Sequence, residues 1–489
     1  MDTADMISVS SEMAEMVLSK LKMTPWFVKG KYRILSVLLQ FTDIEQMMRE
    51  LPEMQTTLLH CLSNSSLAPV AANVYKAFVL EIKKTRNAEA GAAVWEKVWL
   101  EAVLSGLTSH DSLVRSNTSK YLLSQSVKCL PQTSDMVQNA LESKLEGNKQ
   151  ASDRPRVLCA WLALSQIRRN TSSVFSMKLE YVWESLYSED EEIRSNAFSL
   201  ICNTLRKAEP LSKDECKLLM ETIPFNMKVD SAPFRQQLTR DLHNLLVRLR
   251  DSSLAALRDG KTELLDFSVD FLDWFHKLLI ENLLPGASYQ RRKASLDLLS
   301  VLYDTLIYRP DVRHRKDFPP ESSQQLLAYC QRRNLLPLYS PGSMSALLYC
   351  VLDTADLIQA AACSLLMTHH KWPILLDGNQ GDMSGQSTIC HLLREILRLC
   401  NSPKTHESTG GALLCRLVFN KYMLELNWSF SIEYRSEESE FTVSVTDSKY
   451  PASTFTFMNF LLQQLEQSLI ETKSNILSVS KSQPDVRYD

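Results

Sequence analysis

The sequence predicts an all-α protein built as a HEAT/armadillo-like α-solenoid, and three observations carry this prediction. Apolar side chains recur with helical spacing along most of the 489 residues, only 12 residues are glycine, and one sequence phrase returns repeatedly. A chain of this length exceeds the size at which a single hydrophobic core keeps growing, so a repeat array or several domains are expected. Because glycine usually makes up about 7 % of a protein, its scarcity indicates few tight turns.

The stretch from Leu264 to Leu302 shows why the helices must stack. Its first half predicts an amphipathic helix that ends at Pro285-Gly286, since proline disfavours helical geometry before it and glycine accepts a left-handed turn. A second helix is expected to follow, with Ser288 as its N-cap. Two helices joined by a short turn cannot bury both apolar faces alone, so each pair needs neighbours. The residues expected to form the apolar stripe of the first helix are Leu264, Phe267, Phe271, Trp274, Leu278 and Leu279, with Phe275 and Leu283 widening it.

The repeated phrase appears most clearly as DSLVRSNTSKYLL at 111–123 and DEEIRSNAFSLIC at 190–202. Its versions align at Ala71, Arg115, Arg156, Arg194 and Arg235, which are 44, 41, 38 and 41 residues apart, and then at Arg292 and Gln359 after 57 and 67 residues. The shorter intervals are typical of HEAT and armadillo repeats. An aspartate at the turn and an arginine early in the second helix favour the helix dipole and contacts between repeats, so we interpret Asp111, Arg115, Asp190 and Arg194 as structural.

The remainder of the chain divides by composition. The solenoid is expected to span 1–427, with mobile polar insertions at 308–323, 377–387 and 401–411. Alternating apolar and polar residues in WSFSIEY and FTVSVTD predict a small β-hairpin over 428–446. A C-terminal helix over 456–477 and a disordered tail over 478–489 complete the expected organisation.

The run PGASYQRRKASLDLLS at 285–300, preceded by DFLDWFHKLLIENLL, resembles the thyroid adenoma-associated protein (THADA) family. The resemblance implies a HEAT-repeat protein that is the non-catalytic partner of a tRNA ribose 2′-O-methyltransferase and helps to present the tRNA anticodon loop for methylation. S-adenosylmethionine and the catalytic residues then belong to the methyltransferase subunit. Members of the family also carry a motif of the form RRSAGLP, which this sequence lacks, so the resemblance implies a central fragment or short isoform of a longer protein.

No catalytic, cofactor or metal site is predicted. The sequence has no GxGxxG, no GxxxxGK[ST] and no GxSxG, so it lacks the usual phosphate cradles and the nucleophile elbow. The His369-His370 and Cys390-His391 pairs have no further ligands at a metal-site spacing. We therefore predict that the chain is not an enzyme by itself and binds no S-adenosylmethionine.

Cysteine usage and hydropathy predict a cytoplasmic protein. Eleven cysteines occur singly among apolar neighbours without a CxxC pair, as expected for reduced, buried thiols. No run of 18 apolar residues predicts a membrane span, and the N-terminal MDTADMISVSSEM does not read as a secretory signal. A net charge of −3 gives no global attraction to polyanions.

A local excess of positive charge lies between Ser288 and Arg333, where nine basic residues accompany five acidic ones. Basic side chains at a helix start and in an adjoining loop can bind RNA phosphates, and ring side chains can stack on an unpaired base. The candidate phosphate contacts are Arg291, Arg292, Lys293, Arg313, Arg315 and Lys316, and the candidate stacking residues are Tyr289 and His314. A solvated helix face explains the same charges. The alternative function is a protein–protein scaffold of the transport or adaptor type without an RNA role.

We expect the far-ultraviolet circular dichroism spectrum to be dominated by helix, with a helical fraction above ~60 %, about twice the average of globular proteins. A spectrum dominated by strand would contradict the repeat architecture and every inference that depends on it.

Overall fold

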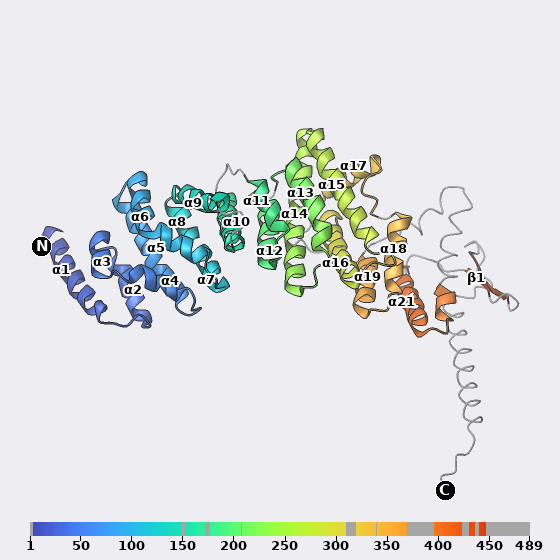
Figure 1. The fold of residues 1–489 in the computed structure, drawn as a ribbon. Coiled ribbons are helices and arrows are strands. Elements are labelled where there is room, and N and C mark those ends of the chain that lie inside the picture. Colours follow the sequence, from blue (N-terminus) through green and yellow to red (C-terminus); the bar gives the residue numbers. More distant parts are fainter. Residues whose placement is uncertain are drawn as a thin grey trace, which may run out of the picture. The chain divides into compact units, whose positions relative to one another are not determined.

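The computed structural model describes residues 3–147, 152–171, 177–206, 208–309, 319–338, 340–368, 396–422, 430–435 and 440–445. These residues are predominantly helical (Figure 1), so the predicted helical-repeat fold is confirmed. The chain divides into two compact units, unit 1 from Met1 to Ser268 and unit 2 from Val269 to Asp489.

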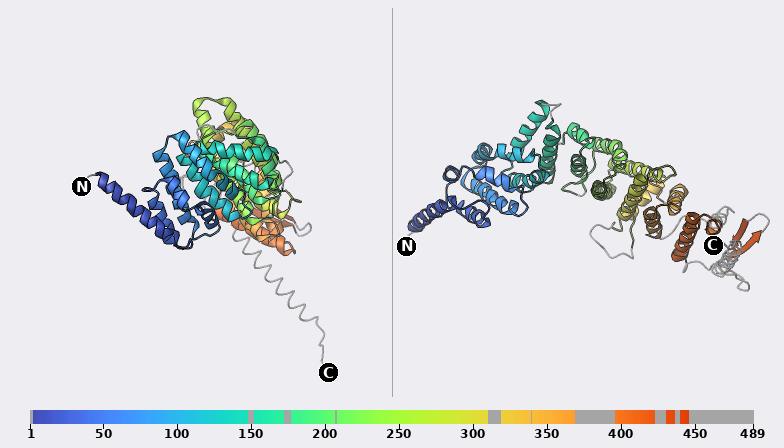
Figure 2. Two further views of the ribbon diagram at one scale, coloured as in Figure 1. Left: turned by 60° about the vertical axis from the view of Figure 1, so that its left-hand side comes forward. Right: turned by 60° about the horizontal axis from the view of Figure 1, so that its bottom comes forward.

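Unit 1 stacks its helices so that neighbours in the sequence are neighbours in space, as the views in Figures 1 and 2 agree. Helices α6 and α9 pack together in one layer, and α10 packs on α12 and α12 on α14 in the other. The helices are α1 (Thr3–Lys22), α2 (Lys29–Leu38), α3 (Ile44–Glu50), α4 (Met54–Cys61), α5 (Ala68–Thr85), α6 (Ala88–Leu107), α7 (Ser112–Asn117), the π-helix η1 (Thr118–Leu123), α8 (Ser124–Cys129), α9 (Thr133–Gly147), α10 (Arg154–Thr171), α11 (Leu179–Leu186), α12 (Glu191–Cys202), α13 (Lys213–Asn226), α14 (Ala232–Asp259) and α15 (Thr262–Glu281), which continues into unit 2.

Unit 2 contains further helices and a pair of strands. Helix α19 contacts α16, α18 and α21. The strands pair antiparallel, with Phe430 opposite Val445. After α15, the elements are α16 (Tyr289–Leu306), α17 (Ser323–Arg332), α18 (Pro341–Val351), α19 (Asp356–Thr368), α21 (Thr405–Tyr422), β1 (Phe430–Arg435) and β2 (Glu440–Val445).

The repeated phrase occupies the same helical position each time. Its aligned residue is the fourth of its helix in α5, α7, α12, α14, α16 and α19, and the third in α10. An interval that places seven residues at equivalent helix positions reflects a structural repeat. The longer intervals before Arg292 and Gln359 therefore reflect longer connections and helices, because the aligned residue is still the fourth residue of its helix.

The aspartate and arginine of the phrase have structural roles, as interpreted from the sequence. Asp111 and Asp190 cap α7 and α12, each accepting a hydrogen bond of 2.8 Å from the backbone N–H two residues later. Arg115 forms an ion pair with Glu192 of α12 at 2.5 Å. The guanidinium of Arg194 lies 5.2 Å from the ring centroid of Phe234 on α14. Each arginine therefore links its own helix to a later one.

Polar side chains also join the helices α10, α12 and α14. Gln166 donates a hydrogen bond to Ser199 at 3.2 Å, Asn203 donates to Asp241 at 3.1 Å, and Asn244 donates back to Asn203 at 2.6 Å. Burial raises the pKa of Asp241, although its amide partners oppose this shift. This row of hydrogen bonds fixes the register between successive helices, because apolar packing alone has little directional preference.

The buried face of α15 is rotated from the stripe predicted by its aromatic residues. Phe271 and Leu279 are buried as expected, but Leu264 is 37 % exposed, and Phe267, Trp274 and Leu278 are only half-buried. The fully buried row is Leu265, Val269, Leu272, Phe275, Leu279 and Leu283, accompanied by the polar residues Ser268 and His276. Assigning Leu264 to the core was wrong because apolar residues occupy both rows and two polar residues lie inside.

His276 is an unusual member of this buried row. Its side chain is 1 % exposed, and neither ring nitrogen has a hydrogen-bond partner among the described residues. Burial lowers the pKa of His276 to about 4, with Asp273 opposing the shift. The imidazole is therefore neutral at pH 7 and packs as a core ring, with its centroid 6.4 Å from that of Tyr303.

The predicted insertion at 401–411 was wrong over most of its length, because α21 begins at Thr405. Its two glycines allow close packing. A Cβ added to Gly410 would lie 2.5 Å from Cδ2 of Leu352, and one added to Gly411 would lie 2.7 Å from the backbone nitrogen of Cys400. Glycine in this segment therefore allows close packing against the Leu352 side chain and the Cys400 backbone, whereas the sequence interpretation took it as a sign of mobility.

The other segment predictions lie partly or wholly outside the described residues. The insertion predicted at 308–323 is described only at its two ends, where residues 307–309 and 319–322 are not helical. Residues 310–318 lie outside the described residues. The segments 377–387, 456–477 and 478–489 are wholly outside. Ten cysteines within the described ranges are free, and no described helix has the length and apolar character needed to cross a bilayer.

Two leucines of α15, the buried Leu272 and the exposed Leu264 eight positions earlier, test the rotated face. Leu272→Ala should lower the free energy of unfolding by about 2–5 kcal/mol, because it removes a fully buried side chain. Leu264→Ala should cost less than about 1 kcal/mol, because that side chain already contacts water. Urea denaturation of both variants gives the comparison, and equal losses would contradict the burial described here.

Candidate nucleic-acid interface

The predicted basic residues begin α16. Ser288 caps the helix, and its Oγ accepts a 3.4 Å hydrogen bond from the backbone N–H of Arg291. Tyr289 is the first helical residue and is 36 % exposed, while Arg291, Arg292 and Lys293 are half-buried. The first turn holds no acidic residue. Positive charges at a helix N-terminus are disfavoured by the helix dipole, by roughly 0.3–1 kcal/mol each, so they require compensation or a role.

Arg292 receives this compensation within the fold. Its Nη1 forms an ion pair with Oδ2 of Asp353, whose side chain is only 3 % exposed. The other carboxylate oxygen of Asp353 accepts a 3.0 Å hydrogen bond from the backbone N–H of Ala355 ahead of α19. Arg292 therefore ties α16 to the turn that starts α19, which gives it a structural role.

Lys293 is also paired, whereas Arg291 and Tyr289 are available. Lys293 forms an i,i+4 ion pair with Asp297 on the same helix. Within the described part of the chain, the guanidinium of Arg291 has no carboxylate partner, and the ring of Tyr289 contacts no other ring. Of the predicted residues that the structure describes, these two side chains remain free to bind a ligand.

The structure does not bring the whole basic stretch into one patch. Arg309 follows the C-terminal end of the 18-residue α16 and pairs with Asp304, so a rise of ~1.5 Å per residue places it roughly 25 Å from Arg291. The other predicted residues, Arg313, His314, Arg315 and Lys316, lie outside the described residues. Among the described residues, the basic side chains from Arg291 to Lys293 and that of Arg309 therefore lie at opposite ends of α16.

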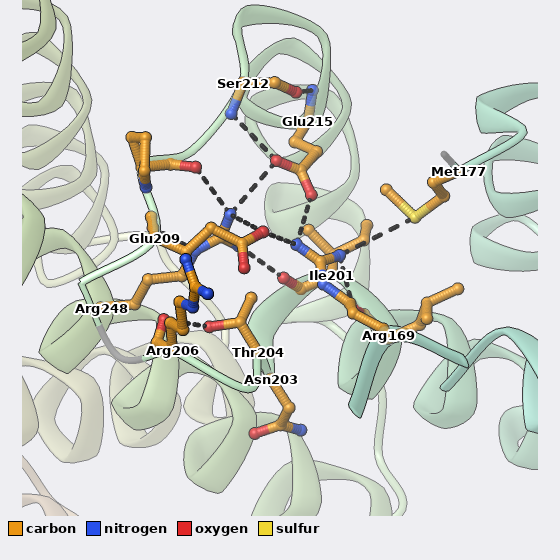
Figure 3. A network of polar contacts seen from close by, with 12 residues as sticks. Arg169, Met177, Ile201, Asn203, Thr204, Arg206, Glu209, Ser212, Glu215 and Arg248 are labelled. Carbon is orange, nitrogen blue, oxygen red and sulfur yellow. Dashed lines mark hydrogen bonds and ion pairs between the residues drawn. The ribbon is translucent and has the colours of Figure 1, made fainter. Parts of the chain in front are cut away.

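A buried polar cluster of unit 1, shown in Figure 3, joins α10, α12, α13 and α14. Arg169 and Arg248, with side chains 5 % and 2 % exposed, both bind the buried carboxylate of Glu215 at 2.9 and 3.4 Å. The half-exposed Glu209 is a second partner of both guanidinium groups, at 3.4 and 3.7 Å. Two positive and two negative charges thus balance within this cluster.

The two guanidinium groups also close the C-terminal end of α12. Arg169 donates to the carbonyl of Leu200 and Arg248 to that of Ile201, both at 2.9 Å. Carbonyl groups in the last turn of a helix have no partner within it, so cations there are favourable. Burial tends to raise the pKa of Glu215, but Arg248 and Arg169 outweigh it and the pKa is lowered. This cluster serves packing and leaves no open site for a ligand.

Neither cluster has the arrangement of a catalytic centre. No group of three or more metal-ligating side chains occurs among the described residues. Burial raises the pKa of the Cys159, Cys216 and Cys350 thiols to between about 11 and 12, which disfavours the reactive thiolate. The buried cluster of Figure 3 was missed from the sequence because its charges come from three separate helices and from the loop before α13. The fold and its polar contacts define a helical-repeat protein.

Comparisons with known proteins show which repeat proteins this chain resembles. The family model described as "Trm732, TPR repeats" matches residues 95–320. The tRNA (32-2'-O)-methyltransferase regulator THADA of Gallus gallus is 21 % identical over 488 residues, and that of Mus musculus is 21 % identical over 489 residues. Each alignment covers 94 % of this chain and 24 % of the relative. The regulator trm732 of Schizosaccharomyces pombe is 22 % identical over 77 % of this chain and 25 % of its own length.

The chain is similar to proteins of the THADA/Trm732 family and spans about a quarter of the length of these curated relatives. A solved structure of a microtubule polymerase with tumour-overexpressed-gene domain arrays aligns over 81 % of this chain with 10 % identity and a TM-score of 0.26. This score is too low to support a conclusion.

The buried cluster makes a prediction about acid stability. Because the folded-state pKa of Glu215 is lowered, its charge stabilises the fold above the unfolded pKa, and this contribution is lost as pH falls through the folded pKa. Glu215→Gln should lower the unfolding free energy at pH 7 by about 1.5–3 kcal/mol, because it weakens charge-assisted hydrogen bonds to two buried arginines. Urea titrations near pH 3 should show a smaller difference in unfolding free energy between this variant and the unaltered protein.

Glu209→Gln provides the matched control, because its carboxylate pairs with the same arginines while 42 % exposed. Its effect at pH 7 should stay below about 1 kcal/mol. Equal effects of the two substitutions would contradict the assignment of Glu215 as the main buried counter-ion.

Proposed function

We propose that this chain is part of a non-catalytic regulator of a tRNA ribose 2′-O-methyltransferase and acts as a helical scaffold for that enzyme. The observation that carries the proposal is the alignment along 94 % of the chain with proteins named as regulators of this methyltransferase. A repeat array suits the role, because stacked helix pairs offer an extended surface to a partner. We infer that this assembly acts in the cytoplasm.

We also propose a division of labour between the chain and its partner. The chain has none of the glycine-rich turns that usually hold a nucleotide cofactor, so S-adenosylmethionine and the catalytic residues are proposed to lie on the methyltransferase subunit. The regulator would then contribute binding and orientation, which raise the rate of a reaction by holding the reacting groups in register.

We further propose that the N-terminal end of α16 contacts tRNA and helps to present its anticodon loop. The unpaired guanidinium of Arg291 and the exposed ring of Tyr289 are the described side chains that support this step. An arginine can bind a phosphate, and a tyrosine can stack on an unpaired base of a loop. Arg313, His314, Arg315 and Lys316 remain part of the proposal on their sequence alone.

Reconstitution with the methyltransferase subunit tests the scaffold function. The purified chain alone should neither bind S-adenosylmethionine nor methylate tRNA, and it should form a complex with the subunit and increase its activity on tRNA. Isothermal titration and a methylation assay provide the two readouts. Tight cofactor binding by the chain alone would overturn the division of labour, and absence of a complex would favour the alternative scaffold of the transport or adaptor type.

Charge removal tests the tRNA contact in the presence of the methyltransferase. Arg291→Ala should weaken tRNA binding and reduce the slope of log K against log salt by ~0.7–0.9, because one phosphate contact is lost. Its melting temperature should be unchanged, since the side chain has no described ion-pair partner. Removal of the whole predicted set should reduce the slope several-fold further. That set is Arg291, Arg292, Lys293, Arg313, Arg315 and Lys316.

Arg292→Ala is the control that separates folding from binding. It leaves the buried carboxylate of Asp353 without its cation and should lower stability by about 1–3 kcal/mol. The double substitution Arg292→Ala with Asp353→Asn should recover part of that loss. An unchanged salt slope in the six-residue variant would exclude this region as the RNA contact.

A further inference from the structure

Three large aromatic side chains lie on the surface of unit 1 where α11 and α13 meet. Trp183, Tyr187 and Phe225 are 50 %, 40 % and 44 % exposed. The Trp183 and Tyr187 ring centroids are 5.0 Å apart, and those of Tyr187 and Phe225 are 5.7 Å apart. The three rings therefore form one continuous surface, the aromatic patch, to which two helices contribute. A contiguous exposed apolar surface of this kind is typical of an interaction site.

The aromatic patch contributes little to the interior of the unit. Helix α11 buries Tyr181, Val182 and Leu186 on its other side, and the Tyr181 ring packs against Trp161 with centroids 5.3 Å apart. Helix α13 likewise buries Leu219 and Ile223. These residues already form the apolar core on the inner side of both helices. The three exposed rings are therefore not needed to bury apolar surface within the unit. The patch also lies within the segment 95–320 matched by the family model.

Acidic side chains flank the aromatic patch. Glu180 precedes Trp183 by three residues on α11, and Glu221 precedes Phe225 by four on α13, so each lies on the same helix face as its ring. Both glutamates are exposed, and neither has an ion-pair partner among the described residues. A further carboxylate, that of Glu184, pairs with Arg154.

The charge of this rim selects the kind of partner. Free carboxylates beside aromatic faces attract a guanidinium or ammonium group, since the ring quadrupole and the carboxylates act in the same direction. The same carboxylates repel phosphate groups, which disfavours RNA as the occupant although aromatic rings can stack on bases. Two exposed lysines lie near the rim, Lys217 four residues before Glu221 and Lys228 three residues after Phe225. Within α11 and α13, however, the unpaired charges one helical turn from a ring are the two glutamates.

We infer that the aromatic patch binds an arginine- or lysine-bearing segment of the methyltransferase subunit. This inference rests on the proposed function, which supplies a protein partner. An enzyme that binds tRNA carries basic surface segments to neutralise phosphates, and such a segment is complementary to aromatic rings rimmed by glutamates. The patch thereby gives the scaffold an enzyme-docking surface that differs in charge from the proposed tRNA contact on α16.

Two variants of the full chain test the assignment with different chemistry. Glu180→Lys with Glu221→Lys reverses the rim charge, and Trp183→Gln with Phe225→Gln removes two rings. The control Glu96→Lys with Glu101→Lys makes the same change in net charge at two exposed glutamates of α6. Circular dichroism checks that all variants fold. Biolayer interferometry measures binding of the purified methyltransferase subunit, and fluorescence anisotropy measures binding of tRNA alone.

The two patch variants should each weaken binding of the methyltransferase subunit about ten-fold or more, because they remove cation–π contacts or replace attraction by repulsion. The control should bind as the unaltered chain does. If the unaltered chain binds the subunit and both patch variants bind it equally well, the patch assignment is wrong while the proposed function stands. If the rim reversal strengthens tRNA binding and leaves subunit binding unchanged, the occupant is RNA and the inference is overturned. No binding by the unaltered chain would overturn both.

Discussion

In several repeats, the side chain of one arginine binds the backbone carbonyl groups of the turn that precedes the second helix. The Nη1 atoms of Arg115, Arg194 and Arg235 donate to the backbone carbonyl six residues earlier, at 2.9, 2.6 and 3.0 Å, and each also binds the carbonyl five residues earlier. At Gln359 the side-chain amide makes the equivalent bond, at 2.6 Å, to the carbonyl of Asp353. Without these donors the turn carbonyls would be left without partners, so the angle between paired helices depends on this contact.

This contact explains why the repeat could be predicted from the sequence. The aspartate cap and the arginine act within one turn and one helix, so their spacing is preserved wherever the turn recurs, and the alignment of Ala71 to Gln359 found equivalent helix positions. The period also agrees better with HEAT and armadillo repeats than with tetratricopeptide repeats of about 34 residues, despite the name of the matching family model. The rotation of α15 could not be predicted, because His276 and Ser268 are polar yet buried.

The candidate sites depend on contacts between residues distant in the sequence, and this limited their prediction. Counting charges found the basic start of α16, but only the fold shows that Arg292 pairs with Asp353, 61 positions further on, and leaves Arg291 unpaired. Trp183, Tyr187 and Phe225 have the spacing of core residues, so a pattern of apolar side chains gave no reason to place them outside. Their exposure follows from Tyr181, Val182 and Leu186 already filling the interior side of α11.

The charges of the chain are therefore distributed by function, although they nearly cancel in sum. Carboxylates inside the fold pair with three arginines, Arg169, Arg248 and Arg292. A ligand could bind these arginines only if an ion pair were broken, and breaking a buried ion pair is strongly destabilising. The charged side chains without an ion-pair partner that the two proposals use differ in sign. Arg291 on α16 is positive, and Glu180 on α11 and Glu221 on α13, beside the aromatic patch, are negative. The proposed scaffold, which would bind both an RNA and an RNA-binding enzyme, would need surfaces of opposite charge, because a uniformly basic surface would attract the RNA and repel the enzyme. A net charge of −3 is consequently compatible with a role in tRNA modification.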